Sequence, residues 1–160
     1  MPRYVNGLDR IDESNRPLAL LYFAFRKVTE RPDRILARHG LTRVHHRILY
    51  FVGRHPGLSV GELLRILSVS KQALHGPMRQ LLSGGWLAAE PVPGNRRAKA
   101  LRLTARGTRL EDRLSGDQRK RFSRAFAAAG KDAASAWTAV MHQLAEEPKR
   151  GSAPRRSPAR

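Results

Sequence analysis

Apolar residues recur at intervals of three and four along most of the chain, which is the period of an amphipathic helix. The first such stretch follows Pro17 and places five apolar side chains on one face: Leu18, Leu21, Tyr22, Phe25 and Val28. Leu20 and Phe23 lie on the other side, so we expect this helix to be buried on two sides. Pro32 predicts a break or kink because it lacks a backbone donor, and Gly40 predicts the end of the helical segment.

The next segment predicts three helices in close succession. Thr42 can cap the first, whose buried stripe recurs at helical spacing: Val44, Ile48, Phe51 and Val52. Ser59 and Glu62 form a capping box, in which each side chain bonds the other residue's free N–H, and they begin a short second helix. Ser70 can cap the third helix, which Gly84-Gly85 ends and which buries three residues: Leu74, Met78 and Leu81.

The pattern becomes that of a hairpin between residues 86 and 103. Residues 86–90 predict a strand, the Pro- and Gly-rich residues 91–95 predict a turn, and residues 100–103 alternate as a return strand should. Thr104 can cap a long helix that Gly130 interrupts, and a final amphipathic helix follows. The apolar positions of these last two helices are Leu110, Leu114, Phe122, Phe126, Trp137, Val140, Met141 and Leu144.

Together these elements predict a mainly α fold, in the α+β class, with a winged helix-turn-helix domain at 41–104. Residues 1–16 are polar and are expected to form a flexible N-terminus. Residues 147–160 form a Pro/Ser/Arg tail that is expected to be disordered and basic. Residues 17–40 and 105–146 remain as flanking helices, with apolar faces that a second subunit can cover.

The charge of the chain points to a polyanionic partner. The sequence has 31 Lys and Arg residues against 13 Asp and Glu residues, a formal net charge of +18. Such an excess predicts attraction to DNA, RNA or an anionic membrane. No cysteine is present, which excludes disulfides, and neither a signal peptide nor an apolar run long enough to cross a bilayer is seen. We expect a cytoplasmic, nucleoid-associated protein that does not enter a membrane.

The third helix carries polar and cationic side chains opposite its buried stripe. Gln72 can pair with adenine and Arg79 with guanine, Lys71 and His75 share that face, and Ser70 at the helix N-terminus suits a phosphate. A solvated helix face often carries similar residues, but the capped helix before it and the hairpin after it favour DNA binding.

The hairpin tip is basic. Asn95, Arg96 and Arg97 stand at the turn, and Lys99 and Arg102 follow on the return strand. An arginine at such a tip can enter a narrow minor groove, where the negative potential is highest. An exposed turn that is basic without a nucleic-acid partner is the plainer interpretation.

The chain resembles the MarR family of bacterial transcription regulators over roughly residues 17–146. The resemblance rests on five stretches: Leu41-Thr42, Ser59-x-x-Glu62-Leu63, Val69-Ser70-Lys71, Leu81 with Gly85-Trp86-Leu87, and Asn95-Arg96-Arg97 through Leu103-Thr104-x-x-Gly107. It implies a homodimer on double-stranded DNA with a palindromic operator, and a repressor is the expected regulator. The dimer contacts are expected from Leu20, Phe23, Phe122, Phe126, Trp137, Val140, Met141 and Leu144.

Two residues depart from the family pattern. MarR-like wings usually begin with Asp, whereas Asn95 stands at that position. Asn95 can still accept a hydrogen bond from Arg97, but it lacks the negative charge that an Asp side chain would add to this bond. Pro77, after Gly76, lies inside the expected recognition helix, where it removes a hydrogen bond.

The resemblance also implies a small aromatic acid as an effector. Arg38 and His45 can hold a carboxylate, with Tyr22 or Phe25 as an aromatic wall. Alternatively, His45 faces inward and satisfies a backbone carbonyl at the domain junction. The side chains of His45 and the adjacent His46 diverge by about 100° on a helix. No Cys or Glu stands nearby at ligand spacing, so the sequence predicts no metal site.

No catalytic constellation is visible. The sequence has no Ser/His/Asp arrangement, no phosphate-binding Gly loop and no H-E-x-x-H motif, so we expect neither an enzyme nor a cofactor. Three alternatives to a specific regulator remain open. They are a nonspecific, chromatin-like DNA-binding protein that works through charge, a winged-helix protein-interaction module, and an RNA-binding protein.

Overall fold

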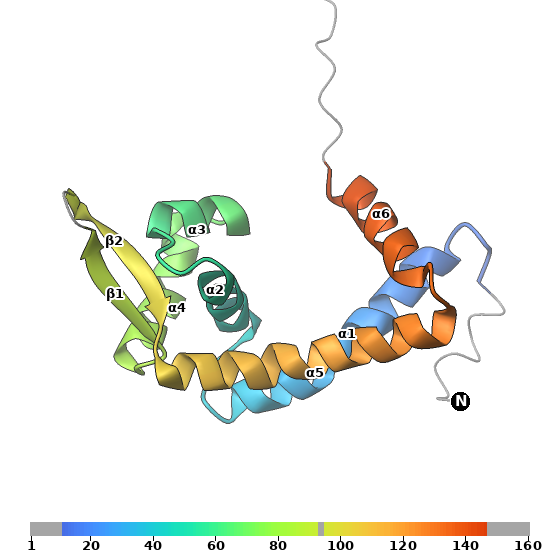
Figure 1. The fold of residues 1–160 in the computed structure, drawn as a ribbon, viewed down its shortest axis with the longest axis horizontal. Helices are drawn as coiled ribbons and strands as arrows, with labels where there is room; N and C mark the ends of the chain where they lie inside the picture. The colour runs from blue at the N-terminus through green and yellow to red at the C-terminus, as the bar shows by residue number, and fades with distance from the viewer. Residues whose placement is uncertain (1–10, 93–94, 147–160) are drawn as a thin grey trace, which may run out of the picture. The chain divides into compact units, whose positions relative to one another are not determined.

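A computed structural model describes residues 11–92 and 95–146, with the side chains of residues 95–98 not described (Figure 1). The elements in chain order are α1 (Arg16–Ala37), α2 (Arg43–Arg54), α3 (Val60–Leu67), α4 (Lys71–Ser83), β1 (Leu87–Val92), β2 (Asn95–Leu103), α5 (Ala105–Ala129) and α6 (Ala133–Ala145). The chain forms two compact units, one up to Arg121 and one from Phe122. Most of the expected flexible N-terminus at 1–16 and all of the expected tail at 147–160 lie outside the described residues.

The mainly helical fold with one small hairpin is confirmed. β1 and β2 pair antiparallel, from Leu87 opposite Leu103 to Val92 opposite Asn95. Both strands extend into the turn expected at 91–95, since β1 continues to Val92 and β2 begins at Asn95. On the other edge of β2, the backbone of Leu101 exchanges hydrogen bonds of 2.9 Å with Gly57 and Leu58. The hairpin is therefore fixed to the segment between α2 and α3.

The core of the first unit gathers side chains from α1 to α5 around the hairpin base. Leu63, Leu74, Leu81, Leu101 and Leu114 are each at most 1% exposed. One expected core position is wrong, because Val44 is 38% exposed and Leu49 is fully buried in its place. The buried face of α2 is therefore rotated from the expected stripe and consists of His45, Ile48, Leu49 and Val52.

α1 does not break at Pro32, where the sequence predicted a break or a kink. α1 continues through Pro32 to Ala37, and the Pro32 ring is among the fully buried side chains. A proline inside a helix costs a hydrogen bond and strains the preceding turn. Packing of the ring beside the buried Ile35 and Leu36 offsets that cost. The helical segment ends where expected, with Gly40 in the left-handed region at φ +66°.

The predicted helix caps are present. Ser59 Oγ accepts from Glu62 N at 3.2 Å, and Glu62 Oε2 accepts from Ser59 N at 2.8 Å, which completes the capping box of α3. Ser70 Oγ accepts from Ala73 N at 3.2 Å at the start of α4. Glu62 has a pKa below its ordinary range because the Ser59 side chain and backbone donate to the carboxylate. Each cap fixes where a helix of the helix-turn-helix begins.

The start of β1 and the start of α5 meet closely at Gly107. Thr104 Oγ1 donates to the Gly85 carbonyl at 2.6 Å and accepts from Gly107 N at 3.1 Å. A Cβ atom on Gly107 would lie 2.0 Å from the carbonyl oxygen of Trp86, closer than atoms can approach. Trp86 itself is buried, with the Arg106 guanidinium 4.4 Å above its ring. Only glycine at position 107 permits this contact.

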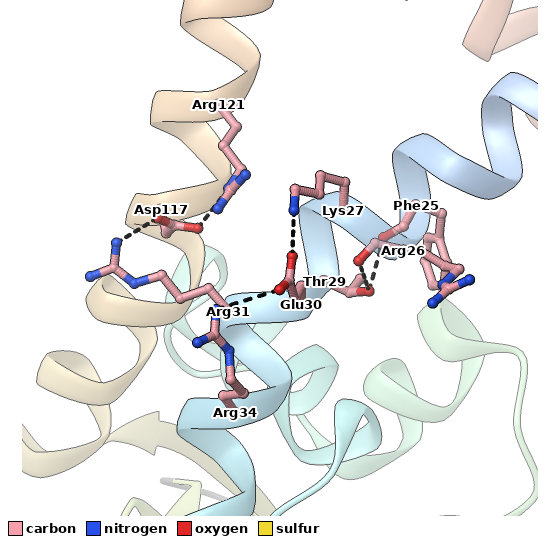
Figure 2. Close-up of polar contacts among 9 residues, drawn as sticks. All are labelled: Phe25, Arg26, Lys27, Thr29, Glu30, Arg31, Arg34, Asp117 and Arg121. Atoms are coloured by element: carbon pink, nitrogen blue, oxygen red, sulfur yellow. Dashed lines mark hydrogen bonds and ion pairs between the residues drawn. The ribbon is translucent and has the colours of Figure 1, made fainter. Parts of the chain in front are cut away.

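α1 and α5 are held together by a carboxylate that serves two arginines (Figure 2). Asp117 on α5 accepts from Arg31 of α1 and from Arg121 of α5, each at 2.9 Å. The Asp117 side chain is 10% exposed, and the Arg121 hydrogen bond is the main cause of its lowered pKa. On α1, Glu30 is paired with Lys27 at 2.9 Å and with Arg34 at 3.7 Å.

The second unit contains a small aromatic cluster. The ring centroids of Phe122 and Phe126 lie 5.3 Å and 5.8 Å from that of Trp137, and 5.7 Å from each other. No residue of α6 is buried. Trp137, Val140 and Leu144 are 41%, 55% and 70% exposed, which is unusual for large apolar side chains on one helix.

Candidate nucleic-acid interface

α4 buries one face and exposes the other as the sequence predicts. Leu74, Met78 and Leu81 are buried on one side. The expected DNA-contact residues Lys71, Gln72, His75 and Arg79 are all exposed. Arg79 forms no hydrogen bond or ion pair with any described residue, so its guanidinium is available to a ligand. The structure therefore brings these four side chains to one accessible helix.

A tight turn presents α4 to the surface. Ser68 ends α3 with φ 51°, in the left-handed region that non-glycine residues seldom adopt. Its backbone N–H donates to the Arg65 carbonyl oxygen at 3.3 Å, and Ser70 begins α4 only two residues later. This is the short helix–turn–helix connection that places a second helix in a major groove.

Pro77 lies inside α4, and the helix continues through it. Pro77 is partly exposed, whereas the buried face of α4 is formed by other residues. The carbonyl of Ala73, four residues earlier, loses its helical donor, and Ala73 is itself exposed. Because water can reach this side of the helix, the proline costs less here than it would in the core.

The hairpin extends from the same unit as α4 and forms the wing (Figure 1). Asn95, Arg96 and Arg97 belong to the first part of β2. Their side chains lie outside the described residues, and so does the expected hydrogen bond between Asn95 and Arg97. Further along the strand, Lys99 is exposed and Arg102 Nε donates to Glu90 Oε2 at 3.1 Å. Arg102 is thus engaged within the wing.

The four residues expected to hold an effector do not line one cavity. Phe25 lines a cavity of about 180 Å³ with Thr29, Arg43, His46, Arg47, Tyr50 and Gln118. Tyr22 is 56% exposed, and Arg38 lines a separate cleft between α1 and α5. The sequence analysis missed Arg43, which lies with its guanidinium carbon 4.9 Å from the Phe25 ring centroid and its Nη2 2.6 Å from Asp33. Arg43 directly follows the Thr42 cap, and this position at the start of α2 is the sequence feature that could have identified it.

His45 points inward, as expected, and contacts a backbone group. Its Nδ1 accepts from Thr42 N at 3.0 Å, and Thr42 Oγ1 lies at the same distance. The expected backbone carbonyl partner is therefore wrong, because the His45 ring nitrogen accepts from a backbone amide. Burial lowers the pKa of His45 below its ordinary value, while a hydrogen bond with the Gln80 side chain acts in the opposite direction.

A buried polar network joins α2 to α5 beside the cavity. Glu111 is 3% exposed, and its Oε1 accepts both from Arg54 Nη1 at 2.9 Å and from the Ser115 hydroxyl. Ser115 Oγ in turn lies 3.2 Å from His46 Nε2, and His46 lines the cavity. Burial lowers the pKa of His46, against the attraction of the Glu111 carboxylate. Glu111 was not expected as a functional residue.

The described residues contain no group of three or more His, Cys, Asp or Glu side chains that could hold a metal ion. Among the helices of this part of the chain, none is both long and apolar enough to span a bilayer.

A capped helix, a short turn, an exposed polar helix and an adjoining basic hairpin define a class: the winged helix-turn-helix DNA-binding proteins. A sequence profile of the MarR family matches residues 39–98. The HTH-type transcriptional regulator PetP of Rhodobacter capsulatus is 35% identical over 133 residues, which are 83% of this chain and 80% of PetP. The chain belongs to the MarR family of DNA-binding transcriptional regulators.

Two solved structures illustrate the similarity. The Mycobacterium tuberculosis MarR family protein Rv2887 in complex with salicylic acid is 28% identical with a TM-score of 0.54, over 79% of this chain and 93% of Rv2887. A mutant of S. aureus MepR bound to an oligodeoxyribonucleotide is 14% identical with a TM-score of 0.58, over 78% of this chain and 92% of MepR.

Proposed function

We propose that this protein is a repressor that binds a palindromic operator as a homodimer, with α4 in the major groove and the wing in the adjacent minor groove. The observation that carries the proposal is the exposed polar face of α4, which stands opposite a fully buried stripe and beside a basic hairpin. The outer face of such a helix has no packing role within the protein. Its side chains carry the hydrogen-bonding groups and positive charges that pair with base edges and phosphates.

Each exposed residue has a chemical role in this proposal. Ser70 and Lys71 meet phosphates, because the N-terminus of α4 carries a partial positive charge. Gln72, His75 and Arg79 face base edges. Asn95, Arg96 and Arg97 serve the minor groove, where arginine is favoured by the potential. The proposed location is the cytoplasm, at the nucleoid.

The proposal of a homodimer rests on apolar side chains that are exposed in the described part of the chain. Leu18, Leu20 and Leu21 on α1 are 67%, 48% and 51% exposed, and α6 exposes Trp137, Val140 and Leu144. A monomer seldom leaves so many large apolar side chains in water. A second copy covers them by two-fold symmetry, which in turn matches a palindromic site.

The proposed effector is a small aromatic carboxylic acid in the cavity lined by Phe25, Arg43, His46 and Tyr50. Two aromatic rings and a guanidinium suit an aromatic ring with a carboxylate. Salicylic acid is the ligand of the Rv2887 complex, which supports this class of molecule. Since Asp33 already pairs with Arg43, the ligand has to share or displace that carboxylate.

The experiment is selection of duplex DNA from a random library with the full-length chain, followed by binding measurements at physiological salt. A specific regulator prefers the selected palindrome to a scrambled duplex by about 10³-fold or more. In vitro transcription from a promoter that overlaps the site then separates repression from activation. Salicylate should weaken binding by the wild-type protein, and Arg43→Ala should remove that response while Arg47→Ala, at the same cavity, reduces it less.

A second candidate is a nonspecific, chromatin-like DNA-binding protein, which the net charge of +18 favours. The same binding ratio decides between the two, because a protein that acts through charge alone binds both duplexes alike. A protein-interaction module, for which Pro77 and Asn95 are the motivating residues, would bind neither duplex.

A further inference from the structure

A second cleft, between the C-terminal half of α1 and the middle of α5, is lined mainly by cations. Its volume is about 530 Å³, within the range of small-molecule sites, about 300–1,000 Å³. It shares no lining residue with the cavity at Phe25. Five cationic side chains line it, and all are exposed: Arg31, Arg34, Arg38, Arg113 and Lys120. The cleft is therefore an accessible and strongly basic site, separate from the proposed aromatic-acid site.

Three of these cations have no internal partner. The side chains of Arg38, Arg113 and Lys120 form no hydrogen bond or ion pair with any residue in the described ranges. The carboxylates on the cleft are those of Asp112 and Asp117, so the lining residues carry an excess of three positive charges. Like charges gathered in one place repel one another, and an anion bound among them relieves that repulsion. The cleft thus favours a ligand with several negative charges.

Arg31 is held in position for such a ligand. Its Nη1 donates to Asp117 Oδ1 at 2.9 Å, as Figure 2 shows, while the Arg31 side chain remains 61% exposed. Asp117 also accepts from Arg121, so it does not serve Arg31 alone. A guanidinium that is already fixed loses less conformational freedom when it bonds to a phosphate through its remaining N–H groups.

A glycine keeps the cleft open. A Cβ on Gly116 would have a single heavy-atom neighbour within 4 Å, Nη2 of Arg119 at 3.8 Å. Gly116 does not have a positive φ, and glycine inside a helix costs stability relative to alanine. Neither packing nor backbone conformation therefore requires glycine here, whereas a ligand in the cleft does. No aromatic side chain is among the described lining residues, and Ile35 is 7% exposed, so an aromatic ligand finds no ring to stack on.

We infer that this cleft binds a phosphorylated sugar or polyol with two phosphate groups. A phosphate monoester carries about −1.5 to −2 charge at neutral pH, so two of them balance the local excess of three positive charges. The phosphates bind the cations of α1 and of α5, which places the ligand across the two helices. Hydroxyl groups of the ligand donate to Asp112, whose side chain is 64% exposed and lies 3.9 Å from Arg119. The inference does not depend on the proposed repressor, because none of the proposed DNA-contact residues lines this cleft.

The first test is calorimetric titration of the full-length chain, without DNA, with fructose 1,6-bisphosphate as the probe. We expect saturable binding of one molecule per chain, at least roughly 10-fold tighter than that of fructose 6-phosphate, which has lost one phosphate. Inorganic pyrophosphate should bind more weakly than the probe, because it has no hydroxyl groups for Asp112. No saturable binding of the probe up to millimolar concentration would overturn the inference. Equal or tighter binding of pyrophosphate would mean a site for a free inorganic anion and would overturn the sugar assignment.

A steric variant distinguishes a cleft from a basic surface. Gly116→Leu retains every charge but fills the cleft, so the probe should bind at least roughly 10-fold more weakly, because the new side chain overlaps the ligand. Gly61→Leu in α3 is the matched control, since a Cβ there meets nothing within 4 Å, and it should bind the probe as wild type does. Thermal unfolding checks that both variants are folded. Unchanged binding by Gly116→Leu would show attraction by charge alone and would overturn the site.

A charge variant gives an independent answer if Gly116→Leu does not fold. Arg38→Ala combined with Arg113→Ala should weaken probe binding roughly 10- to 100-fold, as loss of two charged hydrogen-bond donors does. The matched control combines Arg65→Ala with Arg124→Ala, which removes two exposed cations that form no ion pair with a described residue. Equal losses in the two double variants would overturn the site. Competition of duplex DNA with the probe, together with weaker DNA binding by Gly116→Leu, would identify the cleft as a DNA contact and would also overturn the inference.

Discussion

Arg54 Nη1 lies 2.9 Å from Glu111 Oε1, and the carboxylate that it meets is 4% exposed. The same Glu111 oxygen accepts from Ser115, whose hydroxyl reaches His46 at the proposed effector cavity. Arg54 also lies over the Tyr50 ring at 4.3 Å, and Tyr50 lines that cavity. A ligand in the cavity would therefore contact His46 and Tyr50. His46 is connected through Ser115, and Tyr50 through Arg54, to the buried Glu111 carboxylate between α2 and α5.

Arg54→Ala should destabilise the protein by about 3 kcal/mol, because it leaves the Glu111 carboxylate buried without its cation. Urea unfolding of the full chain measures the change in the free energy of unfolding. Arg119→Ala is the matched control, since Arg119 and Asp112 are 3.9 Å apart and both more than half exposed. That change should remain within about 0.5 kcal/mol. Equal effects of the two substitutions would contradict a special role for Glu111.

Asp117→Asn should destabilise the protein at neutral pH and lose its effect in acid. The pKa of Asp117 is lowered by Arg121 and then by Arg31, so the ionised carboxylate stabilises the folded state. That contribution is complete above the ordinary aspartate pKa, about 4, and disappears as the pH falls through the lowered folded value. Unfolding at pH 7 and at progressively lower pH checks this. A constant difference for Asp117→Asn at all pH values would refute the linkage.

Gly76→Ala should stabilise the fold by about 0.5–1 kcal/mol, because alanine is the better helix former and its Cβ meets nothing within 4 Å. On operator DNA the same substitution should weaken binding, since the added methyl group lies on the exposed side of α4 that is proposed to enter the major groove. Gly61→Ala in α3 has the same open surroundings and serves as the control. Thermal unfolding and fluorescence anisotropy give the two readouts. Stronger or unchanged DNA binding by Gly76→Ala would argue against close approach of DNA at this position.

Arg97→Ala should weaken operator binding by about 1–3 kcal/mol, which is the usual effect of losing one good groove contact. The reason is the proposed insertion of the wing tip into the minor groove. Lys131→Ala, which removes an exposed cation from the segment between α5 and α6, should leave affinity nearly unchanged. Affinity is measured at moderate salt with the selected operator. If Arg97→Ala bound as tightly as wild type, the wing would have no part in recognition.

Local signals predicted most of the fold. The Ser59–Glu62 box, the Ser70 cap and the glycines after α4 are short-range chemistry, and each begins or ends a helix where the sequence indicated. Pro32 and Val44 were misjudged because their outcome depends on packing. The Pro32 ring is buried beside Ile35 and Leu36 in the folded core, and the rotation of α2 that exposes Val44 arises from residues distant in the chain.

The candidate site was predictable in part for the same reason. Residues 71–79 of α4 could be identified because they share one helix and its periodicity. The grouping of Phe25, Arg43, His46 and Tyr50 could not, since it requires the crossing of α1 and α2. The role of His45 depended on one hydrogen bond to a backbone amide three residues earlier, which periodicity alone cannot reveal.

The contact between Gly107 and the Trp86 carbonyl has a mechanical consequence. Because backbone meets backbone at this point, no side chain of residue 107 separates the base of the wing from the start of α5. Any larger residue would have to push the long helix away from the hairpin, so the size of this one residue sets where the wing is seated on α5.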